Sequence, residues 1–85
     1  MFEWYEIKRL ANLEKHGVDF ADVSLFDWTT AKERTDHRHD YGEVRVRAIG
    51  LIDSRLHVLI YVERSKQSVI SLRKANLREI DEWLL

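Results

Sequence analysis

The sequence predicts an α+β fold with two N-terminal helices, an antiparallel β-sheet and a C-terminal helix. Near both ends of the chain, apolar residues recur every three or four positions, as in helices that bury one face. Between them, apolar residues alternate with polar ones or form short runs, which is typical of strands. No proline, repeat or low-complexity tract interrupts the 85 residues. Residues 1–85 are therefore expected to form one domain.

The first predicted elements are a short strand at residues 2–4 and a helix that ends near Gly17. Ile7, Leu10 and Leu13 recur at helical spacing, so we expect them to face the core. Gly17 can take the left-handed conformation that often ends a helix.

A second helix is predicted directly afterwards. Asp19 can cap its first turn, and Val18 can pack on Val23 as a hydrophobic staple. The chain then turns polar, and a strand near residues 30–34 followed by a turn is the expected structure there.

Two strands are predicted in the middle of the chain. Apolar and polar residues alternate over residues 44–49, which places Arg45 and Arg47 on one face. Residues 56–62 are apolar on both faces and should form a central strand, after a hairpin turn at residues 53–54.

The last predicted strand covers residues 68–72, and a terminal helix follows it. Leu77, Ile80, Trp83 and Leu84 are expected on one apolar face of this helix.

Composition excludes several kinds of chemistry. The chain has no cysteine, so it has neither disulfides nor a thiol nucleophile. A net charge of −1 argues against a uniformly basic surface, so any contact with nucleic acid must come from locally clustered cations. The beginning of the chain does not read as a signal peptide, and no apolar run approaches the roughly 20 residues of a membrane span. A cytoplasmic protein is expected.

Arg73 and Lys74 stand where the last strand is expected to become a helix. Basic residues are unfavourable beside the positive end of a helix dipole unless an anion is bound there. Together with exposed backbone N–H groups, they would form a phosphate receptor. The alternative is that both side chains are simply solvated.

Several short motifs follow one another in a specific order along the chain. They are Trp4, Lys8, Asn12, Lys15-His16-Gly17-Val18, Phe20, Glu43, Arg45, Ile49-Gly50, Glu63-Arg64 and Ile70-Ser71-Leu72-Arg73-Lys74-Ala75. In this order, over residues 2–83, they resemble the BrnT family of bacterial type II toxins. The resemblance implies a RelE-like fold and an endoribonuclease that inhibits translation. It also implies a BrnA-like antitoxin of the ribbon-helix-helix class, through which the complex would bind operator DNA and repress its own expression.

RNA cleavage of this kind can proceed without a metal or another cofactor. The 2′-hydroxyl attacks the adjacent phosphate when a base accepts its proton, cations stabilise the phosphorane, and an acid protonates the 5′-oxygen. For charge stabilisation we choose Arg64, Arg73 and Lys74, with Arg45 as a fourth, because guanidinium groups match phosphate oxygens.

His16 is the best candidate for general acid–base catalysis, since a helix C-terminus favours its charged form. It could equally belong to an ordinary helix ending before Gly17. Lys8 and Lys15 could follow the RNA backbone or form a solvated face. Glu63 could act as a base, but orientation of the neighbouring arginine is the preferred role.

Other candidates have weaker support. Trp4 could stack on a base, although a place in the core is preferred. His37 and His39, flanked by acidic residues, could bind a metal, but no further ligands complete a shell and a solvated loop is the favoured interpretation.

Three positions depart from the family pattern. Tyr5 replaces a usual Asp and removes an N-cap, Leu72 replaces Ala and could narrow the phosphate site, and Ser68 replaces a basic residue that could contact RNA. These departures could reduce or alter activity. A separate rival hypothesis is a catalytically inactive module that acts as scaffold and co-repressor. A DNA-binding domain is disfavoured, because no basic recognition helix is present.

Overall fold

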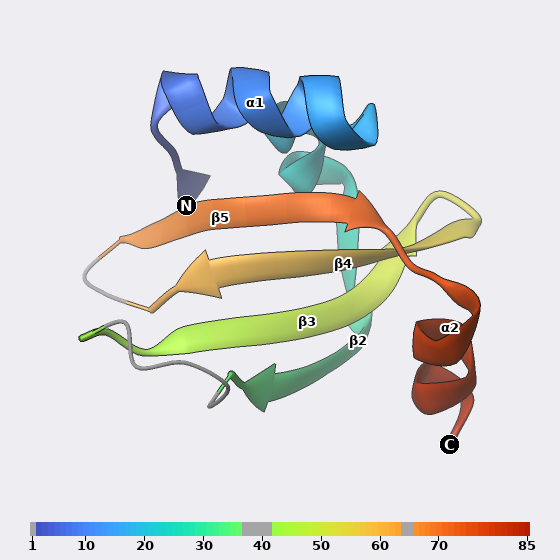
Figure 1. The fold of residues 1–85 in the computed structure, drawn as a ribbon. Helices are drawn as coiled ribbons and strands as arrows, with labels where there is room; N and C mark the ends of the chain where they lie inside the picture. Colours follow the sequence, from blue (N-terminus) through green and yellow to red (C-terminus); the bar gives the residue numbers. More distant parts are fainter. Residues whose placement is uncertain (1, 37–41, 64–65) are drawn as a thin grey trace.

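The computed structural model describes residues 2–36, 42–63 and 66–85, and it confirms the predicted α+β class. A five-stranded sheet has the strand order β1-β5-β4-β3-β2 (Figure 1). The strands are β1 (Phe2–Glu3), β2 (Phe26–Thr35), β3 (Arg45–Ile52), β4 (Arg55–Val62) and β5 (Gln67–Lys74). The helical elements are α1 (Glu6–His16), the 3-10 helix η1 (Phe20–Leu25) and α2 (Leu77–Leu84).

The sheet is mixed and not antiparallel as predicted, because β1 runs parallel to β5. All other neighbouring strands are antiparallel. The central place of β4 and the hairpin before it are confirmed, with Asp53 in the left-handed region at φ 55°. The strand expected at residues 30–34 is also present, but β2 is longer.

The sheet curls until its two edge strands approach each other. Phe2 on β1 and Trp28 on β2 are stacked with ring centroids 5.7 Å apart and planes 7° apart. The curled sheet encloses the larger part of the core, which includes the fully buried Phe20 of η1. Gly50 allows a close approach inside this core, since a Cβ there would lie 2.7 Å from Cζ of Phe26.

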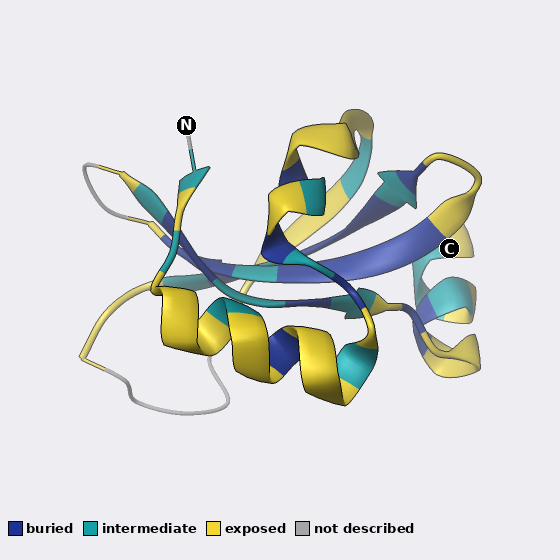
Figure 2. Ribbon diagram, turned by 90° about the horizontal axis from the view of Figure 1, so that it is seen from above, coloured by how far each residue is buried: buried dark blue, intermediate teal, exposed yellow. Residues whose placement is uncertain are grey.

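Helix α1 lies along the edge of the sheet beside β5 (Figure 1). Asn12 is the buried residue of α1. Its side chain forms the hydrogen bonds that a neighbouring strand would otherwise form with the edge of β5. Its Nδ2 donates to the carbonyl of Leu72 at 2.7 Å and its Oδ1 accepts the Leu72 N–H at 3.3 Å. The expectation that Ile7, Leu10 and Leu13 face the core is wrong: they are 79%, 51% and 37% exposed. The outward surface of the helix in Figure 2 is correspondingly exposed, because the polar Asn12 face is the one that completes the sheet edge.

Replacing Asn12 by alanine should lower the free energy of unfolding by about 2–3 kcal/mol, because two buried backbone groups of Leu72 lose their partner. Urea denaturation measures this. The control is Ile7→Ala on the outward face of α1, which should change stability by less than about 0.5 kcal/mol. A larger loss for Ile7→Ala than for Asn12→Ala would contradict this account of the edge.

The second predicted helix is the six-residue 3-10 helix η1 and not an α-helix. Its predicted start is confirmed: Oδ1 of Asp19 accepts the N–H of Ala21 at 2.9 Å, and Val18 and Val23 are both buried. Its length is limited because Phe26 is already extended and begins β2.

Helix α2 packs across one end of the sheet, on the face opposite to the larger core. Ile80 and Trp83 contact a second apolar cluster there, and the Trp83 indole N–H donates to the carbonyl of Thr30 at 2.8 Å. The prediction for Leu77 and Leu84 is wrong, since they are 80% and 68% exposed. The helix is rotated so that Glu79, which bonds to arginines of the sheet, faces inward.

No helix in the described ranges is long and apolar enough to cross a membrane.

Candidate functional site

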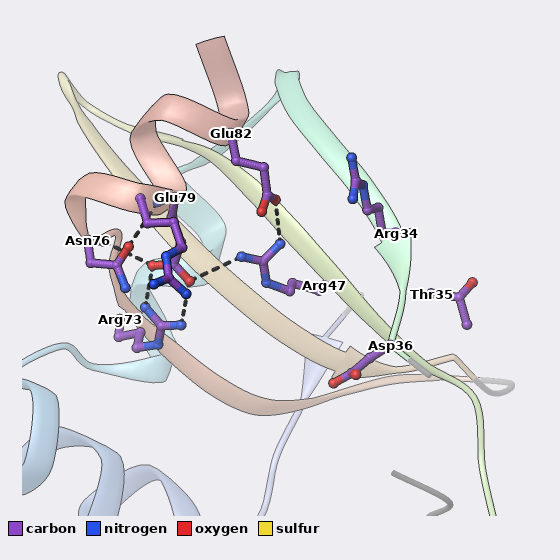
Figure 3. Close-up of a pocket in the computed structure, with 9 residues that line it drawn as sticks. Arg34, Thr35, Asp36, Arg47, Arg73, Asn76, Glu79 and Glu82 are labelled. Atoms are coloured by element: carbon purple, nitrogen blue, oxygen red, sulfur yellow. Dashed lines mark hydrogen bonds and ion pairs between the residues drawn. The ribbon is translucent and has the colours of Figure 1, made fainter. Parts of the chain in front are cut away.

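The face of the sheet that α2 partly covers carries arginines from three strands. Arg34, Arg47, Ile60 and Ser71 are successive partners across the sheet, so their side chains share this face. Arg73 is two residues beyond Ser71 on β5 and lies on the same face. These arginines and α2 enclose an open cleft of about 820 Å³ (Figure 3). Its lining consists of Arg34, Thr35, Asp36, Arg47, Arg73, Asn76, Arg78, Glu79 and Glu82.

Glu79 is the centre of this cleft. The two terminal nitrogens of Arg73 donate to its two carboxylate oxygens, each at 2.7 Å. Arg47 donates to Glu79 at 3.1 Å and to Glu82 at 2.7 Å. Figure 3 shows both guanidinium groups directed at the first turn of α2. The hydrogen bond from Arg73 is the main cause that lowers the pKa of Glu79 to about 2, against the opposing effect of burial.

The same carboxylate caps α2. Oδ1 of Asn76 accepts the N–H of Glu79 at 2.9 Å, and Oε1 of Glu79 accepts the N–H of Asn76 at 2.9 Å. The hypothesis that Arg73, Lys74 and the backbone N–H groups of this helix start together bind a phosphate is therefore wrong. Arg73 and Lys74 are the last residues of β5, the helix begins only at Leu77, and a carboxylate already occupies the helix N-terminus.

The predicted cationic set is only partly brought together. Lys74 pairs with His57 and so lies on the sheet face opposite to Arg73. Arg45 shares the face of Arg47, as predicted, and pairs with Glu43 at 3.5 Å.

Arg64 lies outside the described residues, and so does its expected pairing with Glu63. Glu63 itself is exposed beyond the end of β4, and it borders neither the cleft nor the hollow that holds His16.

His16 belongs to a second, smaller hollow between α1 and the edge of β5. This hollow measures about 270 Å³ and is lined by Lys8, Ala11, Asn12, Lys15, His16, Ile70 and Ser71. The expectation that the helix end favours charged His16 is wrong. Partial burial lowers the pKa of the imidazole, and the charges of Lys15 and Arg73 lower it further. Arg73 thus lines the cleft and acts electrostatically on the hollow beside it.

Sequence reasoning missed Glu79 and did not include Arg47 in the site. Two signals were available. Asn76 followed three residues later by Glu79 is a capping-box pattern, which would have placed the helix start correctly. Arg47 stands on the same strand face as Arg45, which the alternation already indicated.

The three departures from the family pattern have separate outcomes. Tyr5 is the N-cap of α1 and makes no side-chain capping bond, as predicted. Leu72 is fully buried in the core enclosed by the curled sheet, so it cannot narrow the arginine cleft. Ser68 is 3% exposed and therefore does not stand at a surface where RNA would bind.

Trp4 packs against the core, which was the preferred interpretation. Its ring makes an edge-to-face contact with Phe20, and the two ring centroids are 6.2 Å apart. His37 and His39 lie outside the described residues. Within the described ranges, no group of three or more His, Asp or Glu side chains is arranged to hold a metal.

The structure thus defines a small α+β protein in which arginines of the sheet bond to glutamates of the last helix, and in which two lysines and an imidazole surround a separate hollow. The particular family follows from a comparison with family models. The model described as "Ribonuclease toxin, BrnT, of type II toxin-antitoxin system" matches residues 4–79. The chain belongs to this family of ribonuclease toxins, which implies an antitoxin partner. No curated protein matches the chain.

Proposed function

We propose that this protein is a metal-independent endoribonuclease that cleaves RNA with Arg73 of the arginine cleft and His16 of the neighbouring hollow. The observation that carries the proposal is the position of Arg73, which lines the cleft and whose charge lowers the pKa of His16. Cleavage would inhibit translation. A BrnA-like antitoxin of the ribbon-helix-helix class would neutralise the toxin and would link the complex to operator DNA.

In this mechanism His16 is the general base. Because its pKa is lowered, the imidazole is neutral near pH 7 and can accept the proton of the 2′-hydroxyl. The 2′-oxygen attacks the adjacent phosphorus, a 2′,3′-cyclic phosphate forms, and the departing 5′-oxygen takes a proton from water. Arg73 stabilises the negative charge of the phosphorane, and Lys8 and Lys15 hold the flanking phosphates. The phosphate must then share Arg73 with Glu79 or displace that carboxylate.

The pairing of Arg73 and Arg47 with Glu79 and Glu82 favours a second candidate function. In a catalytically inactive scaffold, these arginines would serve only to fix α2 on the sheet. The protein would then act through its antitoxin complex alone, as a co-repressor.

Cleavage of a labelled single-stranded RNA in the presence of a chelator separates the two functions. The wild-type protein should cut and leave 2′,3′-cyclic phosphate ends. Arg73→Ala should reduce the rate by about 100-fold or more, as loss of a transition-state charge contact does. Lys8→Ala/Lys15→Ala alters only exposed side chains of α1 and should weaken RNA binding while the fold is kept.

The control is Arg55→Ala/Lys66→Ala, which removes two exposed cations that line neither the cleft nor the hollow. It should cut like wild type. Thermal unfolding of each variant shows whether a loss of cutting reflects a loss of fold. Cutting that disappears in chelator would contradict metal independence. No cutting by the folded wild-type protein, with or without ribosomes, while antitoxin binding persists, would establish the scaffold.

A further inference from the structure

Two hollows adjoin the contact between the sheet edges, away from the arginine cleft. The stacked rings of Phe2 and Trp28 belong to both. The first, which we call the acidic hollow, measures about 440 Å³ and is lined by Phe2, Trp28, Glu33, Tyr61, Glu63 and Gln67. The second, the apolar hollow, measures about 330 Å³ and is lined by Phe2, Trp4, Ala21, Val23, Ser24, Phe26 and Trp28.

The acidic hollow combines aromatic rings with negative charge. Tyr61 meets Phe2 and Trp28 edge-on, with ring centroids at 5.3 and 6.1 Å. Glu33 and Glu63 are exposed at its rim, and neither carboxylate has an ion-pair partner in residues 2–36, 42–63 and 66–85. Burial raises the pKa of Tyr61 to about 12, and the charges of Glu33 and Glu63 raise it further.

This combination selects a cation. A guanidinium or ammonium group gains from the two carboxylates, and the Trp28 ring, which is 40% exposed, can add to the attraction. A nucleic-acid phosphate would instead be repelled by Glu33 and Glu63, so this surface is unsuited to the RNA that the arginine cleft would bind. The adjoining apolar hollow offers space for an aliphatic side chain next to the cation.

We propose that the two hollows form a docking site for the antitoxin, in which a basic side chain of that partner enters the acidic hollow and a neighbouring aliphatic side chain enters the apolar hollow. The occupant is a protein segment because the site pairs charge recognition with an apolar subsite across the Phe2 and Trp28 rings. The inference rests on the antitoxin partner that the family implies. It is independent of the ribonuclease mechanism.

The probe for this site is the capped dipeptide N-acetyl-Leu-Arg-amide, titrated into the ¹⁵N-labelled full-length protein. Each of the three tryptophans carries one indole N–H, which serves as a reporter for its surroundings. The Trp28 signal should shift saturably, whereas the Trp83 signal should stay in place, because that indole is bonded to Thr30 on the opposite side of the sheet. Glu33→Gln/Glu63→Gln should weaken binding about fivefold or more, since each exposed charge contact contributes modestly.

The matched control is Glu14→Gln/Asp81→Asn, which removes two exposed carboxylates that line neither hollow and should leave binding unchanged. Three results would overturn the proposal: no movement of the Trp28 signal, an equal response to N-acetyl-Leu-Glu-amide, or undiminished binding by the Glu33/Glu63 variant. Spermidine binding as tightly as the dipeptide would also overturn it, because the site would then be a polyamine site. A negative result in the dipeptide titration would not affect the proposal of RNA cleavage. A negative result in the cleavage assay would not affect the interpretation of the titration.

Discussion

Replacement of Glu79 by glutamine should lower the free energy of unfolding by about 3 kcal/mol at pH 7, the size expected when one partner of a buried ion pair is removed. The Glu79 side chain is 8% exposed and receives hydrogen bonds from both Arg73 and Arg47. Glutamine keeps the volume and one acceptor oxygen, so the two arginines are left beside a neutral group. Urea denaturation measures the difference.

Glu82→Gln is the control, because among residues 2–36, 42–63 and 66–85 Glu82 forms an ion pair with Arg47 alone, and its side chain is 33% exposed. It should cost less than about 1 kcal/mol. Equal losses for both variants would contradict a central role of Glu79.

The contribution of Glu79 should also depend on pH. Its pKa is about 2 in the folded protein and has an ordinary value of 4.5 in the unfolded chain. A lowered folded-state pKa means that the stabilisation is complete above the unfolded value and is lost as the pH falls through the folded value. Wild-type stability should therefore decrease between about pH 5 and pH 2 more steeply than that of Glu79→Gln. Parallel pH profiles of the two proteins would argue that the carboxylate is not stabilised in its charged form.

Replacement of His16 by alanine should reduce the rate of RNA cleavage by about 10²- to 10⁴-fold, the usual contribution of a general base. The fold should be kept, because His16 lies only partly buried at the end of α1 and Gly17 still supplies the left-handed C-cap at φ 71°. Single-turnover cleavage with saturating protein measures the chemical step separately from binding.

The pH dependence tests the role more specifically. A base must be neutral, so kcat/KM should fall as the pH drops through the pKa of His16, which lies below the ordinary value of 6.5. Lys15→Gln should move this acid limb to higher pH, because the Lys15 charge is one cause of the lowered pKa. An unchanged rate for folded His16→Ala would remove His16 from the mechanism, and an unmoved acid limb in Lys15→Gln would assign the limb to another group.

Local patterns predicted most of the elements, and the errors have physical reasons. The alternation in β3, the apolar run of β4 and the caps at Gly17 and Asp19 each depend on neighbouring residues, so they were correctly read. The parallel pairing of the two-residue β1 was missed because it depends on β5, which lies at the other end of the chain.

The candidate site was harder to predict, since side-chain pairing is not local. The sequence motifs drew attention to Arg73 and His16, and the structure places Arg73 close enough to lower the pKa of His16. Nothing in the spacing showed that Arg73 is held by Glu79, or that Lys74 lies on the other face of the sheet.

By itself, the sequence determined the α+β class, the positions of most strands and turns, and the membership in the ribonuclease toxin family. Only the tertiary structure decided which face of α1 is buried and which charges are paired. Asn12 bonds to Leu72, 60 residues away, and Arg47 bonds to Glu79, 32 residues away. Periodicity shows which residues share a face of an element, but the packing of distant elements decides what that face contacts.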